Sequence, residues 1–153
     1  MEESIIPFNE QERMKLLHEL HILDTDREEI YDGIVFLASK ICQVPVSTIT
    51  LIDHERQWFK SAIGVQHREN PRIHSFCARA ILGKEILEIP DSLKDDRFKD
   101  NPLAKSDPGV RFYAGIPLEL KDGLNVGTLC VIDHKPNKLS DEQLKALRYL
   151  GWQ

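Results

Sequence analysis

The sequence lacks several features that would point to common classes of protein. Its three cysteines, Cys42, Cys77 and Cys130, are far apart and form neither an even disulfide framework nor a Cys-x-x-Cys pair. No apolar run is long enough to span a bilayer, and the N-terminus lacks the basic and apolar regions of a secretory signal. There is no run of Lys and Arg, and the net charge of -5 argues against nucleic acid or an anionic membrane as the main partner. We therefore expect a cytoplasmic protein with reduced thiols.

What is present fits one globular domain. The chain has 153 residues, which is enough for a sizeable core but short for two domains. We expect a single domain over residues 1–153, with helices over residues 10–22, 26–43 and 140–153 and a core over residues 46–134. Because Trp152 would be an unusual apolar residue to leave at a free end, the last helix is expected to continue towards an output domain in a longer native chain.

Capping signals give the helix starts. Residues 9–12, 25–28 and 140–143 each resemble a capping box, in which the first side chain and the fourth satisfy each other's backbone amides. Apolar residues follow each box at helical spacing. Ser75 is predicted to cap a short helix over residues 76–82, with Gly83 at its end.

The strands follow from their β-branched and alternating residues. We expect strands over residues 46–53, 57–63, 85–89, 112–120 and 125–133, the last two joined in a hairpin around Asp122-Gly123. Residues 91–109 are polar, contain Pro102 and Pro108, and are predicted to be a long loop, called the lid below. The last strand is apolar on both sides, so both faces of the sheet should be covered.

The fold class that follows is α+β. It has a central antiparallel sheet of five to six strands, with the terminal helices on one face and the short helix plus the lid on the other. A lid over a sheet face can form a small-molecule cavity, although it can equally pack solid.

Eight ordered stretches resemble a bacterial GAF domain, of the subfamily found ahead of histidine kinases and diguanylate cyclases. They are LDT (23–25), LID (51–53), RQWFKS (56–61), SFC (75–77), DRF (96–98), NP (101–102), RFYAG (111–115) and GTLCVID (127–133). The resemblance extends from about residue 10 to the end of the chain. It implies a cavity under a lid and a sensory or regulatory role without catalysis, so we expect no enzyme activity and no catalytic residue.

The resemblance and the lid together suggest the ligand-binding residues. The candidates are Phe76, Cys77, Asp91, Phe98, Arg111, Phe112 and Tyr113. Arg111 either latches the lid to an aspartate or reads an anionic ligand, because a guanidinium offers a fixed donor fork to a carboxylate or phosphate. The aromatic rings can stack on a planar ligand, or they can simply build core. The identity of any ligand or cofactor is left open.

Cysteine and histidine give weaker signals. Cys77 and Cys130 are expected to be packing residues rather than redox sensors, and Cys42, at a helix end, is the thiol expected to be most accessible. GAF-fold reductases of free methionine sulfoxide place cysteines in their lids, but this lid has none. His18 and His21 have a spacing that can hold a metal, yet no third ligand is evident, so no metal site is expected.

Two hypotheses for the function remain. The first is a sensory module that binds a small cytoplasmic molecule and acts on an attached output domain. The second is a structural or dimerisation module whose cavity is filled by its own side chains. An open pocket lined by Phe76, Phe98, Arg111 and Tyr113 would favour the first. A homodimer formed through the first and last helices is expected, the alternative being that both helices simply cover their own sheet. No nucleic-acid or membrane partner is expected.

Overall fold

A six-stranded antiparallel sheet organises the molecule. The computed structural model describes residues 6–120 and 123–152. The strand order is β3-β2-β1-β6-β5-β4. In chain order the strands are β1 (Val46–Ile52), β2 (Arg56–Ile63), β3 (Glu69–Pro71), β4 (Leu87–Ile89), β5 (Phe112–Glu119) and β6 (Asn125–Asp133). The predicted hairpin is β5–β6, and β6 lies beside β1 at the centre of the sheet.

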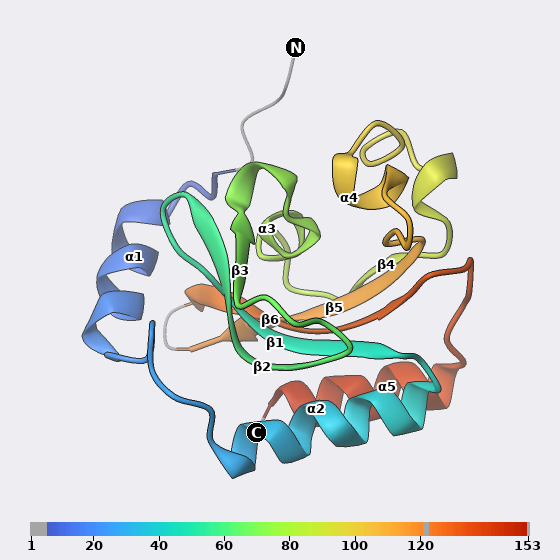
Figure 1. Cartoon of the computed structure of the whole chain (residues 1–153). Coiled ribbons are helices and arrows are strands. Elements are labelled where there is room, and N and C mark those ends of the chain that lie inside the picture. Colours follow the sequence, from blue (N-terminus) through green and yellow to red (C-terminus); the bar gives the residue numbers. More distant parts are fainter. Residues whose placement is uncertain (1–5, 121–122, 153) are drawn as a thin grey trace.

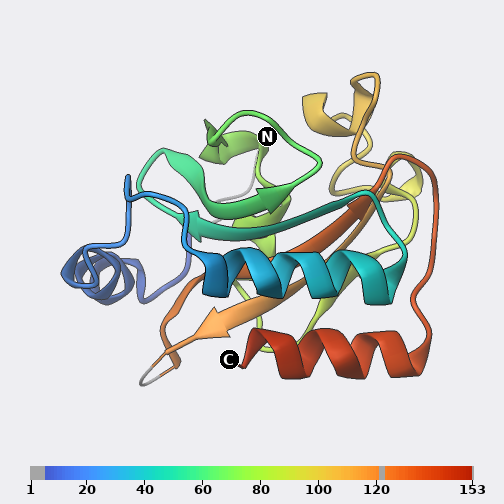
Figure 2. The ribbon, with the colours of Figure 1, turned by 60° about the horizontal axis from the view of Figure 1, so that its bottom comes forward.

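Helices cover both faces of this sheet. On one face α2 (Glu29–Cys42) and α5 (Asp141–Gly151) lie side by side (Figures 1 and 2). On the other face are α3 (Phe76–Ala80), α4 (Pro102–Lys105) and two 3-10 turns, η1 (Arg72–His74) and η2 (Ser92–Lys94). α1 (Glu10–Glu19) packs at one side of the sheet, away from α5. The predicted α+β fold class is confirmed.

The core divides between the two faces of the sheet, as the alternation of β5 and β6 requires. Ile116, Leu129 and Val131 pack with Val35 of α2 and Leu147 of α5. The opposite cluster, between the sheet and the lid, contains Phe76, Phe98, Tyr113 and Cys130. A third cluster joins α1 to the sheet through Met14, Leu17, Leu51, Trp58 and Val126. Among the described residues no helix combines the length and apolar character that crossing a bilayer requires.

Two capping predictions are confirmed. The Ser140 side chain accepts a hydrogen bond from the Gln143 amide at 3.1 Å, and the Gln143 side chain accepts one from the Ser140 amide at 2.9 Å. Ser75 caps α3 by accepting from the Ala78 amide at 3.0 Å. The predicted turn at Asp122-Gly123 lies partly outside the described residues, because residues 121 and 122 are not described, and neither is the last residue of the predicted helix over 140–153.

The capping prediction at residues 25–28 is wrong. α2 begins at Glu29, and Thr25 instead donates to the Ile22 carbonyl. The cause is Lys60, whose fully buried ammonium contacts Thr25 Oγ1 at 2.8 Å, the Asp26 carbonyl at 2.6 Å and the Glu28 carboxylate at 2.7 Å. These three contacts hold the segment before α2 against β2, and it cannot join the helix.

Other element limits also differ from those predicted. Asn9 precedes α1 without a side-chain cap hydrogen bond, and α1 ends at Glu19, three residues early. α3 ends at Ala80, so Gly83 lies beyond its C-terminal cap. The lid contains α4, which Asn101 caps through the Leu103 amide at 2.8 Å. Strand β3, which has only three residues, was not predicted.

Candidate functional site

Three of the predicted ligand-binding aromatics meet beneath the lid. The Phe76 ring from α3 stacks on the Phe98 ring from the lid at a centroid distance of 4.2 Å, and it lies 5.4 Å from the Tyr113 ring of β5. All three side chains are buried. They fill the space between sheet and lid and contact one another instead of lining an opening.

Buried polar groups continue this cluster towards the sheet. Tyr113 donates from its hydroxyl to Cys77 Sγ at 3.1 Å, and Thr128 of β6 donates to the same sulfur at 3.0 Å. Thr48 of β1 contacts Cys130 Sγ at 3.0 Å. Burial raises the pKa of Cys77, but hydrogen bonds from Cys130, Thr128 and Tyr113 outweigh it and lower the pKa to about 7. In the closed domain Cys77 is therefore the thiol that ionises most easily, since the pKa values of Cys42 and Cys130 are raised.

Arg111 and Asp91 form the latch that the sequence suggested. Arg111 donates from Nε and Nη2 to Asp91 Oδ1 at 3.3 and 3.1 Å. The backbone reinforces the pair, because the Ser92 amide donates to the Arg111 carbonyl at 2.7 Å. Arg111 is partly exposed at the rim of the cluster, and its guanidinium already has a carboxylate partner.

Two of the sequence-based expectations fail, because both residues belong to the cluster on the other face of the sheet. Phe112 points to the opposite face of the sheet and packs with the residues of α2 and α5, because alternate residues of β5 face opposite ways. It cannot join a site that contains Tyr113. Cys42 is buried as well, and burial raises the pKa of its thiol to about 11. It is therefore neither accessible nor activated.

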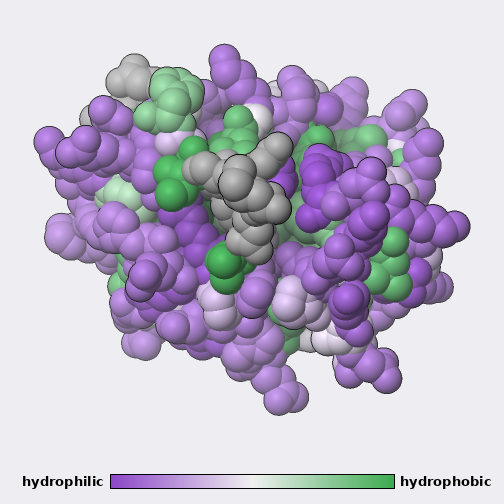
Figure 3. All heavy atoms as spheres, turned by 90° about the horizontal axis from the view of Figure 1, so that it is seen from above, coloured by the Kyte–Doolittle hydropathy of each residue, from purple (hydrophilic) through white to green (hydrophobic). Residues whose placement is uncertain are grey.

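The lid side of the surface is mainly hydrophilic, with small separate hydrophobic areas (Figure 3). Three surface cavities lie elsewhere in the described part of the chain, and none of the three includes a predicted ligand-binding residue. One of about 320 Å³ lies beside α3, and one of about 420 Å³ lies on α5. The third, of about 550 Å³, lies between α1 and the start of the β1–β2 hairpin.

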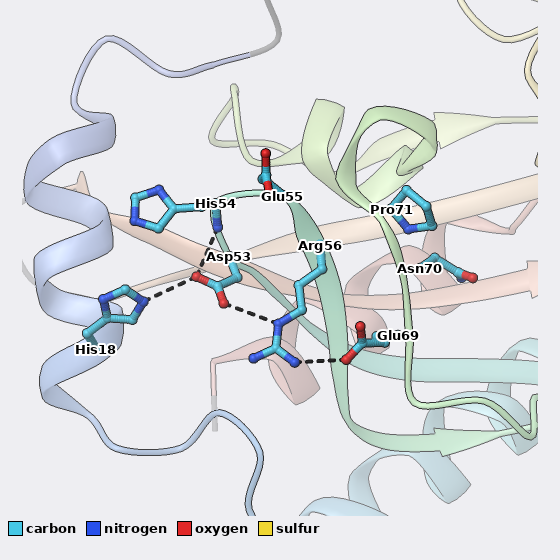
Figure 4. Close-up of a pocket in the computed structure, with 8 residues that line it drawn as sticks. All are labelled: His18, Asp53, His54, Glu55, Arg56, Glu69, Asn70 and Pro71. Carbon is cyan, nitrogen blue, oxygen red and sulfur yellow. Dashed lines mark hydrogen bonds and ion pairs between the residues drawn. The ribbon is translucent and has the colours of Figure 1, made fainter.

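This third cavity gathers polar groups from three elements (Figure 4). His18 comes from α1, Asp53 and His54 from the turn after β1, and Arg56 from the start of β2. Glu55 and β3, with Glu69, Asn70 and Pro71, complete the wall. His18 donates from Nε2 to Asp53 Oδ1 at 3.2 Å, and the His54 amide donates to the same oxygen at 2.9 Å.

Arg56 controls the charge on this cavity. Its guanidinium pairs with Asp53 at 3.2 Å and with Asp24 and Glu69 at 2.8 Å each. These contacts raise the pKa of Arg56 above its usual value, and the hydrogen bond to Asp24 has the largest effect. Burial raises the pKa of Asp53, but the His54 amide, His18 and Arg56 outweigh it and hold that pKa below its usual range. Asp53 therefore stays ionised at neutral pH.

The sequence did not reveal this cavity. His18 is 35 residues from Asp53 in the chain, and only the packing of α1 brings them together. A signal was present in the repeated Ile-Asp-His of residues 52–54 and 132–134. The second copy differs in context, since His134 Nδ1 contacts the Gly109 carbonyl at 3.0 Å.

Comparison with known families decides the identity of the fold. The family model described as the GAF domain matches residues 26–153. The chain belongs to the GAF family. In this family the domain is a regulatory fold, and its members include signalling proteins such as the relative described next.

Known relatives of this GAF domain differ in what they do. A cyclic di-GMP phosphodiesterase of Pseudomonas aeruginosa is 44% identical over 130 residues, which cover 85% of this chain but only 22% of that protein. The GAF domain of an Acinetobacter phosphoenolpyruvate-protein phosphotransferase superposes with a TM-score of 0.66 at 16% identity, covering 100% of this chain and 91% of that one. A free methionine-R-sulfoxide reductase of Neisseria meningitidis superposes with a TM-score of 0.64 at 14% identity, covering 92% of this chain and 83% of that one. At these identities the two structures share the fold alone with this chain.

Proposed function

We propose that the whole chain is one sensory and regulatory GAF domain of a longer bacterial signalling protein. It binds a small cytoplasmic molecule beneath the lid and passes the response to an output domain attached after α5, without catalysing a reaction itself. The relative from P. aeruginosa supports this arrangement, because this chain spans about a fifth of that enzyme's length.

The observation that carries the proposal is that β5 and β6 contribute side chains to the clusters on both faces of the sheet. Tyr113 and Cys130 of these strands belong to the cluster beneath the lid. Ile116 and Leu129 of the same strands belong to the cluster that contains Leu147 of α5. A ligand that displaces Tyr113 therefore moves the strands against which α5 packs. Because a close-packed core has little free space to absorb such a shift, the movement is transmitted to α5.

A specific observation favours the second candidate function. Phe76, Phe98 and Tyr113 already fill the space beneath the lid, and Arg111 is already paired with Asp91. In that case the domain acts through docking or dimerisation and binds no small molecule. The first function requires the lid to open, so that the ligand takes the place of the Phe98 ring.

Native mass spectrometry of freshly purified protein separates the two functions. A ligand-binding domain is expected to carry a co-purified small molecule that is released on unfolding. Hydrogen exchange should then show slower exchange in residues 91–109 of the loaded protein than in the stripped protein. A mass equal to that of the chain alone, together with lid exchange that cell metabolites do not alter, would support the second function.

We also propose that the domain forms a homodimer, through α2 and α5. Exposed apolar side chains occur along this layer, namely Ile30, Phe36, Leu37 and Ile41 on α2, Tyr149 on α5 and Trp152 directly after α5. The dimer first expected paired the first helix with the last, but α1 lies away from α5 and α2 takes the place beside it. In a dimer of this kind the two α5 helices would lead side by side into the output domains.

A further inference from the structure

Three potential metal ligands converge at the wall of the cavity between α1 and β2. One ring nitrogen each from His18 and His54 and one carboxylate oxygen of Asp53 lie within 4.8 Å of one another. The two imidazole rings lie edge to face with centroids 5.7 Å apart, and Figure 4 shows both beside the same carboxylate. Both histidines are exposed to the cavity, so water can reach the open side of the group.

The distances suit a small divalent ion. Two donors bound to zinc at its usual bond lengths and tetrahedral angle lie roughly 3.3 Å apart. His18 Nε2 and Asp53 Oδ1 are already 3.2 Å apart, so an ion can replace the shared proton with little movement. The widest pair, at up to 4.8 Å, must close by roughly 1.5 Å. Rotation of the exposed His54 ring can supply this.

The surrounding charges permit a cation despite the nearby guanidinium. Arg56 is shared by three carboxylates, those of Asp24, Asp53 and Glu69, which leaves this group with a net charge of −2. The adjacent cluster of Glu10, Arg13 and Arg72 carries +1. Arg68, which acts on Asp24, and Glu55 in the cavity wall add opposite charges that cancel. The region as a whole is therefore negative, and a dication is attracted to it.

The carboxylate is also held in the orientation that a ligand needs. Arg56 binds Asp53 Oδ2 at 3.2 Å and leaves Oδ1 directed at His18. On the other side Arg72 donates to the Asp53 carbonyl at 2.9 Å and fixes the backbone of the turn. Such outer hydrogen bonds orient the ligands in protein metal sites.

We propose that His18, Asp53 and His54 bind one divalent transition-metal ion, of the zinc class, with water completing its coordination. Two imidazoles and one carboxylate select such an ion over magnesium or calcium, which prefer oxygen ligands alone. The bound ion would tie α1 to the turn between β1 and β2. This reverses the sequence-based expectation of no metal site, and it does not depend on a ligand beneath the lid.

Zinc titration of the chelator-treated chain tests the proposal. We expect one Zn²⁺ per chain by calorimetry, no comparable heat with Mg²⁺, and a higher melting temperature with zinc than without. His18→Ala and His54→Ala should each weaken zinc binding roughly tenfold or more. Both residues are exposed, so circular dichroism should show that the variants fold.

Two matched controls use histidines outside the cluster. His21→Ala changes a histidine in the turn just after α1, and His134→Ala changes the second Asp-His pair; both should bind zinc as the unaltered chain does. Cobalt should bind at the same stoichiometry without a sulfur charge-transfer band, since all three cysteines are buried elsewhere. The proposal is overturned if zinc does not bind, if binding survives His18→Ala and His54→Ala, or if His21→Ala weakens it equally.

Discussion

Arg111 donates two hydrogen bonds to a single carboxylate oxygen of Asp91. Both side chains are partly exposed, so solvent screens the pair. We expect Arg111→Ala to lower the free energy of unfolding by only about 1 kcal/mol, while hydrogen exchange in residues 91–109 becomes faster. Arg97→Ala is the control, because Arg97 pairs with Asp95 within the lid and does not bridge to β5. Equal exchange in both variants would remove Arg111 from the latch.

Glu10 should make stability depend on acid pH. Burial raises the pKa of Glu10, but Arg72 and Arg13 outweigh it and lower the pKa from 4.5 to about 2. A lowered pKa stabilises the folded state above the unfolded-state value, so this contribution is complete above about pH 4.5 and is lost as the pH falls towards 2.

We therefore expect Glu10→Gln to cost roughly 3 kcal/mol at pH 7, because it leaves the buried Arg13 and Arg72 without a carboxylate. Urea unfolding of both proteins should show this difference shrinking between pH 4.5 and 2. A pH-independent difference would contradict the assignment. Glu12→Gln, an exposed change in the same helix, should show no such trend.

The structure explains why some features could be predicted from the sequence and others could not. The β5–β6 hairpin and the Ser140 capping box depend on residues close together in the chain, and both were predicted. The start of α2 was predicted wrongly because Lys60, 35 residues from Thr25, holds that segment.

The candidate sites also depend on contacts between residues that are far apart in the chain. The residues beneath the lid were suggested by a family resemblance, yet only their packing shows that they fill the space themselves. The cluster of His18, Asp53 and His54 depends on where α1 packs, and no local pattern carries that information.

Gly115 tests the packing beneath the lid. A Cβ atom at this position would lie 2.2 Å from the Tyr113 hydroxyl oxygen and 2.7 Å from the adjoining ring carbon. Gly115→Ala should therefore displace Tyr113 and break its hydrogen bond to Cys77. We expect a loss of about 1–3 kcal/mol in the free energy of unfolding, measured by denaturant titration. Gly33→Ala, where a Cβ meets nothing within 4 Å, is the control and should not be destabilised.

The thiols report on lid opening. All three cysteines are buried, so the native protein should react slowly with an alkylating reagent and quickly once unfolded. When the lid opens, Cys77 should react before Cys42, because Cys77 lies in the cluster beneath the lid while Cys42 lies in the cluster on the other face of the sheet. Peptide mass mapping over time gives the order. Gly115→Ala should speed the labelling of Cys77 selectively, and earlier labelling of Cys42 would contradict this picture.

The last prediction concerns the helix layer. Ile30, Leu37 and Ile41 lie seven and four residues apart, which places them on one stripe of α2, and they are 69%, 47% and 39% exposed. If this stripe forms the dimer contact, Leu37→Glu should place a charge in it and give a monomer, because a buried unpaired carboxylate is costly. Light scattering over a concentration series measures the change.

Leu20→Glu is the matched control, since Leu20 is 44% exposed but follows α1 at the side of the sheet. The unaltered chain should dimerise at micromolar concentration and Leu20→Glu should behave like it. A monomeric unaltered chain, or dissociation by Leu20→Glu alone, would rule out dimerisation through α2.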